Sequence, residues 1–424
     1  MLHRRPTLSG RGHYTQPLFT LASPLTQGGD SLDEKAFIRT LAVSHRYTLE
    51  TAQSNVLQCK FSEDGQMLAV SYADGTVMVH DAMSGEAGAQ VQESFMRSKR
   101  SPKKLMTAHD LPQIVTCLSW RPTSSSKARV LKACGGDGRL LHYTFDKAGA
   151  LTTSQALFKS DFNQYQSLDY SPCGERFVVG GKLPVVEVYD EETGKRVLEF
   201  KRIEGHTSKI FCCKFDSEDE NLIYSGGWDR HVILWDLRAG SRVASLSGPL
   251  ICGDALDTRA PFQLLTGSHT KTDSIQLWDS RTFSDETKRT IPWSSDSTIS
   301  LVYSARFLKP SKCMVLACGV SQSTACILST SQQSDSPSPV YDFIANNTQL
   351  QGRTIVASDA TDQVCAFGSV SGQVVVSNLI KFDKVSMLNG SHKSNSLRDV
   401  FQGAKQGGAG CEGDLPSHDL LNQK

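Results

Sequence analysis

The sequence of 424 residues predicts an all-β fold built from repeated units. Short apolar runs bounded by Gly, Asp, Ser or Pro recur along the chain, which is the pattern of β-strands separated by turns. No segment shows a sustained helical period. The units recur about every 40–45 residues, and this spacing is typical of a ring of four-stranded sheets. We therefore expect a seven-bladed β-propeller of four-stranded antiparallel blades, with disordered N- and C-terminal tails.

Each expected blade contains an apolar strand, a turn with Gly, Asp or Ser, and a closing strand. Blade six is degenerate, and the last blade lacks an obvious outer strand after Asn378. The segments that mark the blades in chain order are 56–81, 108–143, 168–190, 205–236, a unit ending at 275–279, 304–328 and 364–378.

The stretch 37–43 has strand character and precedes the first blade. We infer that it supplies the missing strand of blade seven and closes the ring, because closure removes exposed sheet edges. The expected organisation is a flexible basic tail over 1–35, a propeller over 36–382 with an insertion at about 86–107, and a disordered tail over 383–424.

Blade four carries the most specific pattern, a Gly-His pair followed by an Asp-containing turn and an apolar strand that ends in Trp-Asp. This order resembles the WD-repeat family and implies its hydrogen-bonded tetrad. By that resemblance His206 bonds Asp229, and Ser225 and Trp235 complete the network. A buried His and Asp are costly unless each satisfies the other. The other blades lack one or more of these residue types, so we expect most of them to depend on packing alone.

Composition excludes several classes of protein. Lys and Arg number 45 against 44 Asp and Glu, which weakens the case for a broad nucleic-acid or membrane surface. No apolar stretch reaches the roughly 18 residues of a transmembrane helix. The 12 cysteines include no CxxC pair, and most lie on expected strands, where Cys behaves as a small buried apolar residue. We expect a reduced compartment, cytoplasmic and/or nuclear.

Motifs for catalysis are missing from the sequence. A GxGxxG at Gly408, Gly410 and Gly413 has neither the preceding strand nor the following helix that a dinucleotide site requires. No nucleophile accompanies His206 and Asp229 in their motif. We expect no catalytic residue, no cofactor and no bound metal, and therefore a protein that is not an enzyme.

Two consecutive blades end in Trp-Asp-x-Arg, at 235–238 and 278–281. This pattern resembles the motif of substrate receptors for cullin-RING ubiquitin ligases, in which the arginine pair, here Arg238 and Arg281, helps dock the adaptor. The alternative is that both are ordinary turn residues, because Trp-Asp is the closing pair of WD repeats in general.

Residues 97–104 form the strongest charge cluster, with five basic residues among eight. They make either a solvated loop or a site for nuclear import or an acidic partner, with Ser101 before Pro102 as a phosphorylation site. The candidate residues are Lys99, Arg100, Ser101, Lys103 and Lys104.

Three functions remain open. The first is a non-enzymatic scaffold that assembles a multiprotein complex through the propeller faces. The second is a ubiquitin-ligase substrate receptor that uses Arg238 and Arg281. The third is a chromatin- or RNA-associated propeller, which depends on the basic loop alone. We expect protein partners, no membrane contact, and no nucleic acid in the first two cases.

Overall fold

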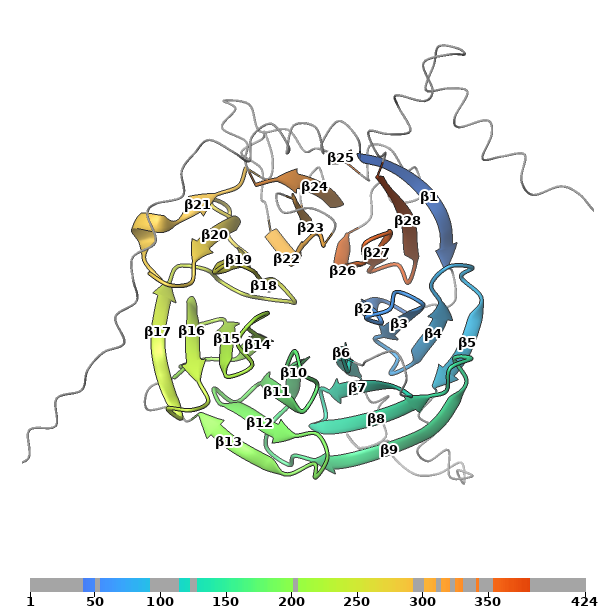
Figure 1. The fold of residues 1–424 in the computed structure, drawn as a ribbon, viewed down its shortest axis with the longest axis horizontal. Coiled ribbons are helices and arrows are strands. Elements are labelled where there is room, and N and C mark those ends of the chain that lie inside the picture. The colour runs from blue at the N-terminus through green and yellow to red at the C-terminus, as the bar shows by residue number, and fades with distance from the viewer. Residues whose placement is uncertain are drawn as a thin grey trace, which may run out of the picture.

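The computed structural model describes residues 41–49, 54–91, 114–122, 128–200, 205–292, 301–309, 314–320, 325–330, 341–342 and 354–381. Their strands form seven four-stranded antiparallel sheets arranged as a ring (Figure 1). The predicted seven-bladed propeller is therefore confirmed. One short 3-10 helix, η3 (Asp285–Thr287), occurs among these residues, and no helix there is long and apolar enough to cross a membrane.

Within each blade the four strands are ordered from the centre of the ring to its rim (Figure 1). Blade one consists of β2 (Val56–Phe61), β3 (Met67–Tyr72), β4 (Val77–Asp81) and β5 (Ala87–Val91). Blade two consists of β6 (Val115–Trp120), β7 (Arg129–Gly135), β8 (Arg139–Phe145) and β9 (Leu151–Lys159). Blade three consists of β10 (Tyr165–Tyr170), β11 (Arg176–Gly181), β12 (Val186–Asp190) and β13 (Arg196–Phe200).

Blades four to seven follow the same order. They consist of β14 (Ile210–Phe215), β15 (Leu222–Gly227), β16 (His231–Asp236) and β17 (Ser241–Ser247); β18 (Leu256–Arg259), β19 (Gln263–Gly267), β20 (Ile275–Asp279) and β21 (Arg289–Thr290); β22 (Leu301–Phe307), β23 (Met314–Val320), β24 (Ala325–Ser329) and β25 (Tyr341–Asp342); and β26 (Ile355–Ala360), β27 (Val364–Ser369), β28 (Val374–Lys381) and β1 (Leu41–Leu49).

The N-terminal strand β1 closes the ring by pairing with β28, the last strand of the chain (Figure 1). Closure by an N-terminal strand is thus as inferred, but the strand lies at 41–49 rather than 37–43, and 37–40 lie outside the described residues. Tyr47 extends the closure to blade one, because its hydroxyl donates to the carbonyl of Ala82 at 2.9 Å.

The expected insertion at 86–107 needs a correction at its start. Residues 87–91 form β5, the outer strand of blade one, because they pair with β4. The remainder of that insertion, the basic loop and both predicted tails lie outside the described residues.

The hydrophobic core lies between the blades. Each of seven buried clusters joins the facing sides of two neighbouring blades. Between blades three and four, for example, Val186 and Phe200 pack with Ile233 and Trp235. Burial of this apolar surface, worth about 25 cal/mol per Å², holds each blade against the next.

The antiparallel order gives the ring two distinct faces. We call the face where the inner strands begin the start face, and the opposite one the end face. The start face carries the connection into each inner strand and the turn between the second and third strands. The end face carries the other two turns of each blade.

Candidate functional site

The blade-four motif residues lie in one chain of hydrogen bonds. His206 Nδ1 is 2.8 Å from Asp229 Oδ2, and His206 Nε2 is 2.7 Å from Ser225 Oγ. The indole N–H of Trp235 donates to the same Ser225 oxygen at 2.7 Å. A neutral His206 with its proton on Nδ1 satisfies every donor, since the serine hydroxyl then donates to Nε2.

The Asp229 carboxylate anchors this network to the turn between β15 and β16. It also accepts a hydrogen bond from the backbone N–H of Thr207 at 2.9 Å. Burial raises the pKa of Asp229, but the hydrogen bond from His206 and the backbone donors outweigh it, so the pKa is lowered overall. The turn therefore contains a fixed negative charge that hydrogen bonds from its own blade stabilise.

The other blades keep only parts of this arrangement. In blade five the indole of Trp278 donates to Thr266 Oγ1 at 3.0 Å. In blade two Asp137 forms an ion pair with Arg139 at 2.8 Å, and the expected His109 lies outside the described residues. In blade one a buried histidine, His80, occupies the tryptophan position.

Arg238 and Arg281 lie at equivalent turns of adjacent blades on the end face, with side chains 60% and 47% exposed. Each guanidinium donates two hydrogen bonds to the carboxylate of the aspartate in its own Trp-Asp pair. Arg238 bonds Asp236 at 3.0 and 2.9 Å, and Arg281 bonds Asp279 at 3.0 and 2.6 Å. Both arginines are therefore held in one orientation, and part of their hydrogen-bonding capacity is already used. The candidate residues Lys99 to Lys104 lie outside the described part of the chain.

The end-face mouth of the central channel carries a ring of seven residues, six of them charged, that the sequence does not reveal. Its members occupy equivalent positions near the ends of the inner strands and alternate in sign around most of the ring. In blade order they are Lys60, Ser119, Asp169, Lys214, Asp257, Arg306 and Asp359.

Each aspartate of this ring also bonds the backbone of the following blade. Asp169 accepts from the N–H of Phe215 at 3.0 Å, and Asp257 accepts from that of Phe307 at 2.9 Å. The expectation that most blades depend on packing alone is therefore wrong, because charge-assisted bonds also join blades three to four and five to six.

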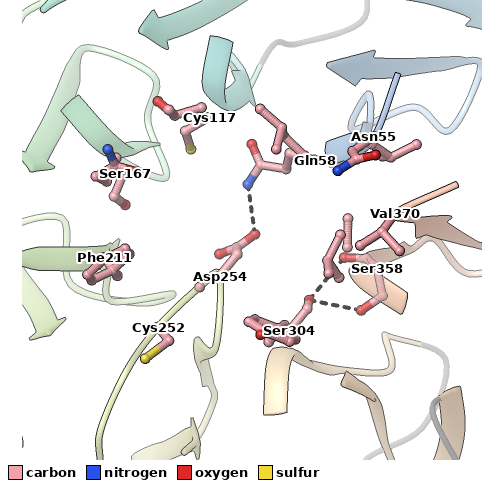
Figure 2. Close-up of a pocket in the computed structure, with 18 residues that line it drawn as sticks. Asn55, Gln58, Cys117, Ser167, Phe211, Cys252, Asp254, Ser304, Ser358 and Val370 are labelled. Carbon is pink, nitrogen blue, oxygen red and sulfur yellow. Dashed lines mark hydrogen bonds between the residues drawn. The ribbon is translucent and has the colours of Figure 1, made fainter. Parts of the chain in front are cut away.

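Asp254 occupies the centre of the channel. It projects from the connection before β18 and binds Lys60 at 2.5 Å and Gln58 Nε2 at 3.0 Å (Figure 2). It also forms an ion pair with Arg306 of blade six. Burial opposes ionisation, but Arg306 and Lys60 outweigh it and hold the pKa of Asp254 far below its usual range. A carboxylate held in this way is a poor proton acceptor and a strong link between blades one, five and six.

The start-face mouth is a cavity of about 250 Å³ with residues of all seven blades in its wall (Figure 2). A register shift near the start of six inner strands explains part of this wall, because a β-bulge redirects a side chain. The residues at the shifted position, with Asp254 as their equivalent in blade five, are Leu57, Thr116, Gln166, Phe211, Tyr303 and Val356.

Large apolar side chains are exposed on the same face as this mouth. Of the nine exposed ones among the described residues, five lie on start-face connections. These are Ile114, Phe162, Leu183, Trp228 and Val370. The described residues contain no cluster of His, Cys, Asp and Glu that could hold a metal ion. The start face therefore combines a cavity of mixed polar and apolar lining with exposed apolar side chains on the same face, which is an arrangement suited to binding.

Two family models match parts of the chain. Residues 197–236 match the model described as WD domain, G-beta repeat, and residues 38–123 match the model described as Anaphase-promoting complex subunit 4 WD40 domain. The first match covers blade four up to Asp236 and contains the His206–Trp235 network.

The chain is also similar to curated G-protein β subunits. Guanine nucleotide-binding protein subunit beta of Lymnaea stagnalis is 25% identical over 181 residues, which are 42% of this chain and 47% of that protein. The Arabidopsis thaliana protein of the same name is 27% identical over 180 residues, or 39% and 45% of the two chains. Subunit beta-1 of Homarus americanus is 26% identical over 127 residues, or 29% and 35%. The chain thus spans less than half the length of the relatives it matches.

Proposed function

Since the chain belongs to the WD40-repeat β-propeller family, we propose that it is a non-enzymatic scaffold that assembles a protein complex mainly through its start face. The observation that carries this proposal is the concentration of exposed apolar side chains on the start-face connections. Grouped apolar residues on a surface mark interaction sites.

The end face offers less apolar surface to a partner. Phe262 is exposed there, but the guanidinium of Arg281 lies 4.8 Å from its ring. The charges at the end-face mouth are paired with one another, as in the 2.8 Å contact of Lys214 with Asp169. A partner would have to displace these internal pairs, whereas the start face requires only that apolar side chains be covered.

Rigidity supports the same function. Strand β1 closes the ring, and Asp254 links blades across the channel through its ion pair with Lys60. The start-face connections are therefore held on a rigid ring. A preorganised surface loses little conformational freedom on binding, which improves affinity for a given contact area. The ten cysteines among the described residues are free thiols, which is consistent with our proposal that the protein acts in the cytoplasm or nucleus.

A ubiquitin-ligase substrate receptor is the second candidate. Its support is the equivalent orientation of Arg238 and Arg281 in adjacent blades, both fixed by their own aspartates. Arginine forks can recognise carboxylates or carbonyls of an adaptor. A chromatin- or RNA-associated role depends on residues 97–104, which the structure does not describe.

Affinity purification with identification of bound proteins tests these functions. We expect wild-type protein to recover partners that a start-face variant, Phe162→Ser with Leu183→Ser and Trp228→Ser, loses. The matched control is Val197→Ser with Val243→Ser, which changes exposed apolar residues on outer strands. Equal recovery by both variants would show that the start face is not the docking surface.

The receptor hypothesis has its own variant in the same experiment. Arg238→Ala with Arg281→Ala should lose a cullin-RING adaptor while circular dichroism shows an intact fold. Failure of the wild-type protein to recover any adaptor would remove the ligase function and leave both arginines as turn residues.

A further inference from the structure

The most exposed aromatic feature of blade four is a tryptophan on a rigid turn. Trp228 lies between β15 and β16 and is 48% exposed. Its ring stacks on Phe211 with centroids 5.2 Å apart, and its indole N–H donates to Cys252 Sγ at 3.1 Å. Its backbone N–H donates to the carbonyl of Lys209 at 3.0 Å.

The network beneath this turn fixes its position. Trp228 directly precedes Asp229, which is bonded to His206. Gly227 is required on the other side, because a Cβ there would lie 2.0 Å from the carbonyl oxygen of Lys209. The one complete His–Asp–Ser–Trp network among the described residues thus supports the turn that presents an exposed tryptophan.

Three basic residues lie on the start face of blades three and four, and one of them contacts the tryptophan. The Lys209 ammonium lies 4.9 Å from the Trp228 ring centroid. Arg230 is exposed on the same turn as Trp228, and Lys182 is exposed on the equivalent turn of blade three. Among the described residues, no carboxylate lies within ion-pair distance of these three cations. We call this surface the Trp228 platform, and it consists of Lys182, Lys209, Phe211, Trp228 and Arg230.

Acidic residues nearby do not cancel this charge. Asp229 is buried in its network with a side chain that is 4% exposed. Asp161 is the other carboxylate on the described start-face connections of blades three and four, whereas three cations lie there. The platform is therefore locally basic although the whole chain has a net charge of only +1.

We propose that the Trp228 platform binds an extended acidic segment of a partner protein, with one apolar side chain of that segment seated on Trp228. This proposal rests on the proposed scaffold function and names the chemistry of the partner. Unpaired cations attract an acidic chain and fix its register, while the desolvated tryptophan supplies most of the affinity.

A protein segment fits this surface better than a nucleic acid does. Binding to a phosphate backbone requires many cationic contacts, because counterion release supplies most of its affinity. The platform has three cations and one exposed indole, and its neighbours on the face are the aliphatic and aromatic side chains of Leu183 and Phe162. These apolar neighbours match side chains of a peptide.

Fluorescence anisotropy of labelled synthetic peptides tests the proposal on the full chain. The probe is a short peptide that alternates glutamate pairs with single leucines, and its counterpart has lysine in place of every glutamate. We expect the acidic peptide to bind and the basic one not to bind. Trp228→Ala should weaken binding about tenfold or more, and Trp228→Phe should restore part of it.

The charge contribution has a matched control. Lys182→Glu with Lys209→Glu and Arg230→Glu should abolish binding, whereas Lys159→Glu with Lys195→Glu and Arg242→Glu should not, although both triple variants have the same net charge. All six residues lie outside the buried core. Thermal unfolding of each variant confirms that it is folded.

Three results would overturn the proposal: no binding of the acidic peptide, equal binding by the two triple variants, or stronger binding of a single-stranded oligonucleotide than of the peptide. If the start-face variant loses partners in purification while the acidic peptide does not bind, the scaffold function stands and this partner chemistry is wrong.

Discussion

The carboxylate of Asp359 accepts a hydrogen bond from the backbone N–H of Phe61 at 2.8 Å, although 298 residues separate the two. Asp359 belongs to the last blade and Phe61 to the first, so this bond crosses the seam where the chain closes on itself. The same bond joins blade three to four and blade five to six. Closure therefore depends on an inner polar contact as well as on the outer strand β1.

Replacing Asp359 with Ala should destabilise the ring at its seam. The backbone N–H of Phe61 would lose a charged acceptor, and loss of one partner of a buried hydrogen bond costs about 1–3 kcal/mol. Asp362→Ala, at an exposed position in the adjacent turn, is the matched control and should change stability little. Urea unfolding of both variants measures the difference, and equal midpoints would contradict a stabilising role for this bond.

The blade-four network should contribute to stability in the same range. Asp229→Ala leaves His206 without its acceptor, and we expect a loss of about 1–3 kcal/mol. Asp74→Ala is the control, because Asp74 occupies the same turn of blade one and bonds the backbone N–H of Thr76 at 2.9 Å. A thermal unfolding shift that is equally small in both variants would show that His206 and Asp229 do not hold the blade together.

Ring closure by β1 predicts a sharp boundary for N-terminal deletion. Removing residues 1–36 leaves β1 intact and should be tolerated, whereas removing 1–50 exposes the edge of β28 and should cause aggregation. Size-exclusion chromatography and thermal unfolding distinguish the two. A monomeric, cooperatively unfolding 51–424 chain would mean that the ring closes without its N-terminal strand.

The repeat and the blade order could be predicted from the sequence because each inner strand has a local apolar pattern. The exact place of β1 could not. Apolar character favours 37–43, but pairing with β28 selects 41–49, which includes the polar segment Ser44 to Thr48. Arg46 shows why, since its guanidinium bonds the carbonyl of Met83 at 2.7 Å and the side chain of Asn378 at 2.9 Å. Those partners become neighbours only in the closed ring.

The central position of Asp254 in the channel could not be predicted from the sequence either. Asp254 lies in a connection with no motif, and Lys60, its partner across the channel, is 194 residues away. The alternating charges near the ends of the inner strands were visible in the sequence as Lys60, Asp169 and Lys214. They acquire meaning only when the blades are superposed, which needs the register that the structure provides.

The buried histidine of blade one predicts a pH dependence. His80 stands where Trp235 stands in blade four, and its ring nitrogens have no hydrogen-bond partner of normal geometry among the described residues. Burial lowers the pKa of His80 below its ordinary value of 6.5, and a contact with the backbone of Gly85 offsets part of that shift. The unfolded chain therefore binds a proton at a higher pH than the folded chain does.

The sign of the effect follows from proton linkage. Well above pH 6.5 His80 is neutral in both states and contributes no pH dependence. As the pH falls through 6.5 towards the folded pKa, protonation favours the unfolded state and the free energy of unfolding decreases. His80→Phe removes this site, so the stability of the variant should fall less than that of the wild type across this window. His45→Phe, at an exposed position, is the control and should follow the wild type. Parallel curves of unfolding free energy against pH for His80→Phe and wild type would show that His80 does not make the propeller sensitive to acid.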